Sequence, residues 1–189
     1  MRLPIISISI CASILMAVML YETPNIHFLP TNINYNSLTQ PAKKQIDCLA
    51  ENIYFEAAHE PTDGKIAVAM VTLNRVISGR YADTICDVVY QKIKYDSKVV
   101  CQFSWVCEDG PMSRRLTIRG TSLYNEIRDL SVRVFLNYDK MRDVTHGATY
   151  YHADYVNPGW KLPITTKIGR HIFYKKTGDL ENKSKEINL

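Results

Sequence analysis

Several absences narrow what this sequence can encode. Its 189 residues contain no internal repeat and no low-complexity block, which excludes a repeat array and a compositionally disordered chain. The net charge is only +4 and the basic residues are scattered, so no nucleic-acid-binding stripe is expected, although the mild basic excess suits an anionic polymer. No Cys-x-x-Cys pair occurs, which disfavours a structural zinc site. The hydrophobic content of 46% then indicates one globular domain with a sizeable core.

The N-terminus is typical of an export signal. Arg2 precedes an uncharged apolar run from Leu3 to Leu20, close to the roughly 18–20 residues that cross a bilayer. Ala17-Val-Met19 is a poor cleavage site, so a removed signal peptide and a retained anchor both stay open. We expect an exported protein of the periplasm or cell envelope whose N-terminal segment meets the membrane, anchored in the inner membrane if the run is kept. The predicted organisation is a signal or anchor at 1–20, a linker at 21–40, a domain at 41–177 and a polar tail at 178–189.

Cysteine usage agrees with export. Cys11 lies in the apolar run, and Cys48, Cys86, Cys101 and Cys107 lie in the body of the chain. Four cysteines in an oxidising compartment predict up to two disulfides, and all three complete pairings are open.

The hydrophobic periodicity predicts an α+β domain that is mostly helical. Thr39 is a candidate cap for the first helix, Thr62 or Asp63 for the second, and Gly79 ends the second. In a simple helical hairpin Asn74 and Arg75 lie far from the end of the first helix, so structural roles are expected for both. The predicted helices are 41–58, 65–77, 85–91 and 121–136, a turn is predicted at 108–111, and an antiparallel β-hairpin pairs 148–153 with 170–175.

Glu56 is the strongest candidate for chemistry. It lies on the flank of the apolar stripe of the first helix, near the break at Pro61, whereas Glu51 and Glu60 belong to the second, polar face. Partial desolvation at such a position raises the pKa of a carboxyl group toward the range that a general acid needs. Most glutamates are solvated surface residues, so the choice between a catalytic and a surface role for Glu56 depends on the neighbouring motifs.

Five stretches match one enzyme family in order. They include Asn52-Ile-Tyr-Phe-Glu-Ala-Ala-His-Glu-Pro61 and Gly147-Ala-Thr-Tyr-Tyr-His-Ala-Asp-Tyr-Val-Asn-Pro-Gly-Trp160. The complete set is 49–76, 81–89, 101–105, 147–160 and 167–173. As spaced motifs over about 48–174, they resemble the SleB-like cell wall hydrolases, which include the spore cortex-lytic enzymes.

The resemblance implies a lysozyme-like fold that cuts the glycan strands of peptidoglycan, with Glu56 as the catalytic glutamate. One departure concerns the residues next to it. The family usually has Gly-Glu-Ala-Arg-Gly-Glu where this chain has Phe55-Glu-Ala-Ala-His-Glu60, so the acid is kept while local substrate contacts differ.

The chemistry also follows from the residues alone. Ordinary glycosidases pair the acid with a second carboxylate about 5–9.5 Å away. A lytic transglycosylase needs one glutamate, which protonates the glycosidic oxygen and then accepts a proton from the muramyl 6-hydroxyl as a 1,6-anhydro ring closes. Glu56 is therefore predicted to act alone, without metal or organic cofactor. Candidate substrate contacts are Glu60, Gln102, Ser104, Tyr151 and His152, and the aromatic residues Phe103, Trp105, Tyr150, Tyr155 and Trp160 either line a groove or belong to the core.

Strand alternation separates some of these candidates. Tyr150 and His152 are expected on one face of their strand and Tyr151 on the other, so only one set faces a cleft.

Two alternative functions stay open beside glycan cleavage. A zinc amidase acting on the stem peptide would gather His146, His152, Asp154 and His171, although no His-Glu-x-x-His motif is present. The third possibility is a non-catalytic module that binds the cell wall.

Overall fold

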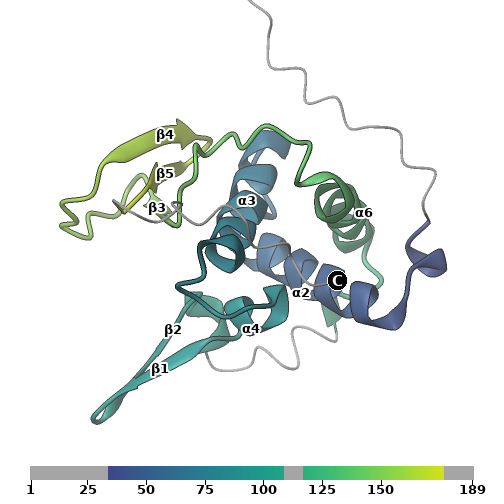
Figure 1. Ribbon diagram of the computed structural model, residues 1–189, viewed down its shortest axis with the longest axis horizontal. Coiled ribbons are helices and arrows are strands. Elements are labelled where there is room, and N and C mark those ends of the chain that lie inside the picture. Colours follow the sequence, from purple (N-terminus) through teal and green to yellow (C-terminus); the bar gives the residue numbers. More distant parts are fainter. Residues whose placement is uncertain (1–33, 109–116, 177–189) are drawn as a thin grey trace, which may run out of the picture.

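Helix α2 (Gln40–Ala57) lies at the centre of the fold and carries Glu56 in its last turn (Figure 1). The computed structural model describes residues 34–108 and 117–176. These ranges hold four α-helices and two antiparallel sheets, which confirms the predicted α+β class. The other elements are α3 (Thr62–Ser78), α4 (Ile85–Val89), α6 (Ser122–Asn137), β1 (Lys92–Tyr95), β2 (Lys98–Cys101), β3 (Tyr150–Ala153), β4 (Ile164–Ile168), β5 (His171–Tyr174) and the 3-10 helices η1 (Tyr35–Ser37) and η2 (Ser104–Val106).

Helix α2 begins and packs as its sequence predicts. The Thr39 side chain accepts a hydrogen bond from the amide of Ala42, and Pro41 lies in the first turn, where a missing amide proton costs nothing. Its apolar stripe is completely buried and packs against α3, α4 and α6. Burial of this stripe on three sides fixes the direction in which the last turn projects.

Helix α3 is buried on nearly all of its surface and begins earlier than predicted. Its first residue is Thr62, and the N-cap is Pro61, so the prediction that Thr62 or Asp63 caps the helix is wrong. Pro61 has a φ of −55°, which suits the start of a helix, and its side chain makes no capping hydrogen bond. Gly79 ends the helix in the left-handed conformation, as predicted.

Helices α4 and α6 each begin after a threonine that caps them. The Thr84 hydroxyl accepts a hydrogen bond from the amide of Asp87, and the Thr121 hydroxyl accepts one from the amide of Tyr124. These bonds satisfy amide groups that a helix start leaves without partners. Both helices then pack an apolar face onto the core.

The larger sheet has three strands in the order β3-β5-β4. Tyr151 in β3 lies opposite Phe173 in β5, so the predicted antiparallel pairing of these two segments is confirmed. They do not form a simple hairpin, however, because β4 precedes β5 and pairs with its other edge. Strand β4 was not predicted, since Ile164-Thr-Thr-Lys-Ile168 is short and lacks a clear apolar alternation.

The smaller sheet is the β1-β2 hairpin, which projects from the body of the domain (Figure 1). It was also missed from the sequence. Every residue of β1 is exposed, so neither strand shows the alternation of buried and exposed positions by which a half-buried strand is recognised. The motif at 101–105 covers the end of β2 and the start of η2.

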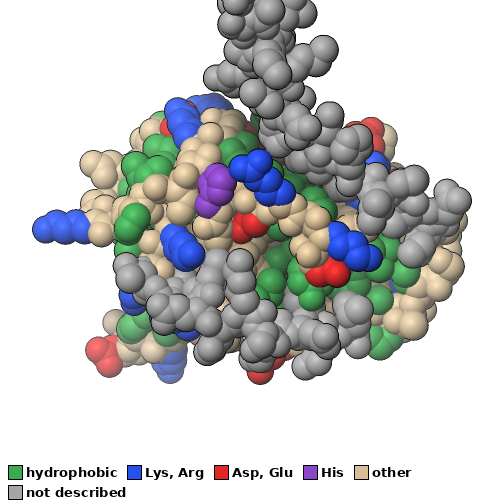
Figure 2. All heavy atoms as spheres, turned by 45° about the horizontal axis from the view of Figure 1, so that its top comes forward, with side chains coloured by type: hydrophobic (Ala, Val, Ile, Leu, Met, Phe, Trp, Pro, Cys, Tyr) green, Lys and Arg blue, Asp and Glu red, His purple; other side chains and the backbone are tan. Residues whose placement is uncertain are grey.

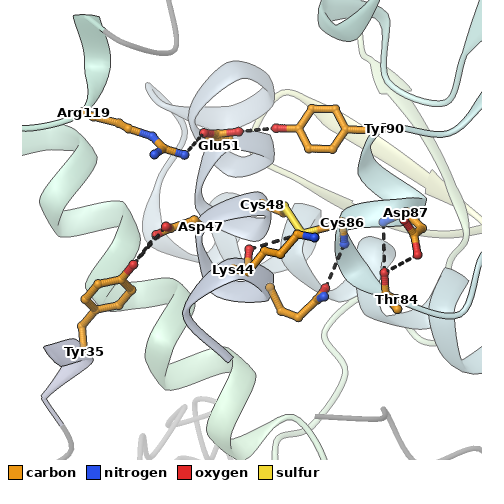
Figure 3. Close-up of a disulfide and its surroundings, with 11 residues drawn as sticks. Tyr35, Lys44, Asp47, Cys48, Glu51, Thr84, Cys86, Asp87, Tyr90 and Arg119 are labelled. Atoms are coloured by element: carbon orange, nitrogen blue, oxygen red, sulfur yellow. Dashed lines mark hydrogen bonds and ion pairs between the residues drawn. A yellow bond between two sulfur atoms is a disulfide. The ribbon is translucent and has the colours of Figure 1, made fainter. Parts of the chain in front are cut away.

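Two disulfides join segments of the domain, a pairing that the sequence left open. Cys48 on α2 is bonded to Cys86 on α4 (Figure 3). Cys101 at the end of β2 is bonded to Cys107. The first crosslinks two buried helices, and the second closes a short loop after the β1-β2 hairpin.

Glu51 departs from its prediction. It was assigned to the polar face of the first helix, but its side chain is fully buried (Figure 3). Its carboxylate pairs with Arg119 at 2.6 Å and accepts a hydrogen bond from the Tyr90 hydroxyl. A buried carboxylate persists only with such partners, and here they come from α4's end and from the residues before α6.

The residues before α2 belong to the folded domain. Tyr35 and Leu38, in the stretch predicted as linker, pack against the core, and the Tyr35 hydroxyl donates to Asp47. Within residues 34–108 and 117–176, no helix combines the length and apolar character needed to cross a bilayer. The predicted export segment at 1–20, most of the predicted linker, most of the turn at 108–111 and the tail at 178–189 lie outside the described residues.

Candidate active site

Glu56 lies at the seam between two cavities. One cavity, of about 500 Å³, is lined by the end of α2 with Thr117 and Ile118. The other, of about 460 Å³, is lined by the 102–108 segment, β3 and Arg75. Phe55 and Glu56 line both. An extended polymer that fills both cavities therefore passes over the Glu56 carboxyl group.

The surroundings of Glu56 favour its protonated form. Burial raises the pKa of the Glu56 carboxyl above its usual value, and the nearby Glu108 carboxylate acts in the same direction. The hydrogen bond from Tyr151 and the positive charge of Arg75 oppose this rise. Burial is the largest of these causes, which is the environment predicted from the helix flank.

Tyr151 fixes one oxygen of the acid. Its hydroxyl donates to Oε2 of Glu56 at 2.8 Å. The Tyr151 ring is held edge-on by His171, with ring centres 5.2 Å apart, and it also packs against Phe173. Because Oε2 accepts this bond, Oε1 is the oxygen from which we expect the neutral acid to donate its proton.

Arg75 lies in this site, and the prediction that it is remote is wrong. It lines the same cavity as Glu56, and its Nε donates to the carbonyl of Thr149 at 2.8 Å. Asn52 donates to the Thr72 hydroxyl, so the middle of α3 meets the last turns of α2. Arg75 follows Thr72 by one helical turn, and its long side chain reaches the cavity from there.

The guanidinium of Arg75 is held in a restricted position. It lies 4.7 Å from the centre of the Phe103 ring and 5.5 Å from that of Tyr81, and its Nη1 is buried without a hydrogen-bond partner. Asn74, by contrast, has the expected structural role. Its amide donates to Asp143, Thr145 and the carbonyl of Ala148, which ties α3 to the approach to β3.

The other predicted contacts divide between the two cavities. Gln102, Ser104, Tyr151 and His152 line the cavity that contains Arg75. Glu60 lines the other cavity, but its Oε2 accepts a hydrogen bond from the Arg170 amide at 3.0 Å. That bond fastens the β4-β5 turn to the end of α2, so Glu60 positions the sheet that carries Tyr151.

The aromatic candidates separate into core and surface residues. Phe103 and Trp105 are buried, and Trp105 stacks on Phe55 and donates to Asn52. Tyr155 is 76% exposed and lines the cavity beside Glu56. The remaining two, Tyr150 and Trp160, pack against each other.

The predicted alternation along β3 is visible in the contacts. Tyr151 reaches Glu56, whereas His152 stacks on Tyr174 and its Nε2 is hydrogen-bonded to the Tyr174 hydroxyl at 2.7 Å. Tyr150 and His152 both contact Trp160, which marks their common face. His152 nevertheless lines the same cavity as Tyr151, so the expectation that only one set faces the cleft is not met for His152.

The side chains of the zinc alternative are otherwise engaged. Asp154 pairs with Lys167 at 3.0 Å, and His171 packs on Tyr151. Among the residues that the structure describes, no group of three or more His, Cys, Asp or Glu side chains is arranged to hold a metal ion.

Glu108 was not singled out from the sequence. It lines the cavity with Glu56 and is exposed. Glu108 reaches the cavity because it follows the buried η2 residue Trp105 and the disulfide-bonded Cys107. No local sequence pattern indicates this location. On the face shown in Figure 2, acidic and basic side chains are interspersed.

Solved structures share this fold. One is the catalytic domain of the germination-specific lytic transglycosylase SleB from Bacillus anthracis, with 25% identity and a TM-score of 0.50, covering 74% of this chain and 98% of that one. A second is the catalytic domain of the Bacillus cereus SleB protein, with 24% identity and a TM-score of 0.52, covering 79% and 97%. The second likeness concerns the fold alone.

Curated relatives show the same relationship in sequence. The spore cortex-lytic enzyme of Halalkalibacterium halodurans is 29% identical over 131 residues, which are 68% of this chain and 34% of that protein. The spore cortex-lytic enzyme of Bacillus cereus is 27% identical over 153 residues, 77% of this chain and 50% of that protein. The chain thus spans about a third to a half of the length of these relatives. The model of the Cell Wall Hydrolase family matches residues 59–174, more than half of the sequence, and the chain therefore belongs to that family.

Proposed function

We propose that this protein degrades peptidoglycan by cleaving the muramyl-glucosaminyl bonds of its glycan strands, with Glu56 as general acid and then base. The position of Glu56 at the seam of two cavities is the observation that carries this proposal. A glycan that extends through both places a glycosidic oxygen over the carboxyl group. Membership of the Cell Wall Hydrolase family and the likeness to lytic transglycosylase SleB support the same substrate and reaction.

The geometry supports a sequence of two proton transfers. Glu56 in its neutral form donates the proton on Oε1 to the glycosidic oxygen, and the bond to the anomeric carbon breaks. The carboxylate that remains is stabilised by the Tyr151 hydroxyl and by the charge of Arg75. It then accepts the proton of the muramyl 6-hydroxyl as that oxygen closes the 1,6-anhydro ring, which regenerates the acid.

Hydrolysis is the second candidate, and Glu108 is the observation that favours it. Glu108 lines the cavity next to Glu56 and is a carboxylate able to activate water. In that case both glutamates are needed and the products have reducing ends. Mass spectrometry of the muropeptides distinguishes the routes, since anhydromuramyl ends indicate a transglycosylase, reducing ends a hydrolase and freed peptides an amidase.

Substitution of single glutamates tests the assignment. We expect Glu56→Gln to abolish the release of muropeptides from purified sacculi while binding persists. Glu126→Gln, on the exposed side of α6, is the matched control and should leave the release unchanged. If Glu108→Gln alone abolishes activity, the single-acid route is wrong. If Glu56→Gln keeps full activity, the whole assignment fails.

We also propose that the protein acts in the cell envelope with its N-terminal segment at the membrane. The apolar run at 3–20 and the two disulfides support this location. Cell fractionation and alkylation of free thiols in the isolated protein test both parts of the proposal.

A further inference from the structure

The β1-β2 hairpin exposes more apolar surface than a stabilising element normally does. Ile93 is 42% exposed, Tyr95 59%, Val99 50% and Val100 40%. The hairpin projects away from the helices (Figure 1), and a two-stranded hairpin gains little stability by itself. A segment that leaves such side chains in water is often a binding surface.

The pairing register gives the hairpin two different faces. Ile93 lies opposite Val100 and Tyr95 opposite Lys98, which makes one face mostly apolar with an ammonium group near the turn. Lys94 lies opposite Val99 and Lys92 opposite Cys101, which makes the other face basic. Three lysines against the single Asp96 leave the hairpin positively charged.

These lysines are available for a ligand. All three are exposed, and within the described ranges they take part in no salt bridge. Lysines held for stability would instead have carboxylate partners on the domain. As far as the described residues show, Lys98 thus presents an ammonium group without a carboxylate partner beside the apolar residues, and Lys92 and Lys94 present two more on the opposite face.

The hairpin and the wall of the active-site cavity form one unit. Gln102, which lines the cavity, follows β2 directly, and its amide donates to the carbonyl of Gln91 at 2.9 Å, closing the base of the hairpin. The disulfide between Cys101 and Cys107 closes the loop that holds Gln102 and Ser104. The base of the hairpin therefore adjoins the wall of the cavity that contains Glu56.

We propose that the β1-β2 hairpin binds the stem peptides of the glycan strand that occupies the active site. This proposal rests on the function proposed above. Stem peptides carry free carboxylates and alanyl methyl groups, which match the lysines and the apolar residues respectively. Each strand of the hairpin is about 13 Å long, the length of a few extended residues. The charge of the hairpin and its continuity with the cavity wall favour this anionic peptide over a neutral glycan.

Binding to two forms of one substrate tests the proposal. The first is purified sacculi without attached wall polymers, and the second is the glycan from the same sacculi after enzymatic removal of the stem peptides. The full chain with Glu56→Gln serves as reference because it does not digest the substrate. We expect the added substitutions Lys92→Gln, Lys94→Gln and Lys98→Gln to weaken binding to intact sacculi about 3- to 30-fold at low salt. Binding to peptide-free glycan should be unchanged.

The matched control replaces exposed lysines elsewhere, with Lys44→Gln, Lys140→Gln and Lys161→Gln, and should bind both substrates like the reference. Circular dichroism verifies that each variant is folded. Ile93→Ser with Val100→Ser, a second route to the same answer, should also lower binding to intact sacculi alone. The proposal is overturned if all variants bind intact sacculi equally or if the hairpin variants lose binding to both substrates equally. Vesicles of anionic lipid are a third ligand, and a loss of binding seen with the vesicles alone also overturns the proposal. A wild-type protein that binds sacculi through these lysines but releases no fragment instead refutes the proposed function and leaves this binding site standing.

Discussion

The two disulfides are expected to differ in what they do, although their chemistry is the same. Cys48 and Cys86 are separated by 38 residues, and Cys101 and Cys107 by 6. A crosslink stabilises a fold mainly by restricting the unfolded chain, and this effect grows with the length of the loop. The chain-entropy relation assigns about 4 kcal/mol to the first disulfide and about 2 kcal/mol to the second.

Paired alanine substitutions measure these contributions. We expect Cys48→Ala with Cys86→Ala to lower the free energy of unfolding in urea by about 4 kcal/mol, with a further loss because both positions are buried in the core. Cys101→Ala with Cys107→Ala should lower it by about 2 kcal/mol. The second pair closes the loop that lines the cavity, so its removal should reduce muropeptide release more than its effect on stability explains.

Unfolding of the wild-type protein with and without a reductant supplies the control. The reductant should reproduce the part of both losses that comes from the disulfide bonds, without the packing loss that replacement of the buried Cys48 and Cys86 side chains adds. It should have no effect on a variant that lacks all four cysteines. Equal destabilisation by the two pairs would refute the argument from loop length. An unchanged midpoint under reducing conditions would show that the disulfides are absent from the isolated protein.

Three further substitutions probe the site. Tyr151→Phe removes the hydroxyl that stabilises the Glu56 carboxylate, so the pKa of Glu56 should rise further and the alkaline limb of the pH profile of muropeptide release should move to higher pH. A limb that moves to lower pH contradicts this assignment. Arg75→Met should shift the same limb upward, because a positive charge is lost, and should cost about 1.5–3 kcal/mol in urea unfolding because the hydrogen bond from the charged guanidinium to the Thr149 carbonyl is lost. Gly169→Ala, at a φ of +56°, puts a methyl group 1.9 Å from Oε2 of Glu60, so it should displace this carboxylate and lower activity. The control Gly79→Ala, at a φ of +66°, has no neighbour within 4 Å and should show only the backbone penalty of about 1–2 kcal/mol in the free energy of unfolding. Equal losses of activity in the two glycine variants would remove the positioning role of Glu60.

The sequence predicted the elements whose signals are local. Thr39 caps the first helix, as predicted, because a hydroxyl at that position satisfies an amide of its own first turn, and Thr84 and Thr121 cap α4 and α6 in the same way. Glu56 was found from its place on the flank of an apolar stripe, which the structure shows as a desolvated carboxyl.

The residues that were misjudged depend on contacts between distant segments. Arg75 reaches the cavity because of how α3 crosses the end of α2, and nothing in its own helix states that crossing. Glu51 has the pattern of a surface residue and is buried because Arg119, 68 positions later, neutralises it. Strand β4 forms because β5 offers it an edge, which is a property of the sheet and not of the Ile164–Ile168 sequence.

The seam at Glu56 has a consequence for where along a polymer the cut falls. A pocket that ends at the acid would admit only a chain terminus, and cleavage would proceed from that end inward. Here hollows of similar size lie on either side of the carboxyl group. Under the function proposed above, a strand that occupies both hollows has sugars on both sides of the bond that is cut, so interior bonds are expected to be as accessible as terminal ones. The expected pattern is endolytic, with long fragments early in digestion and single disaccharides late.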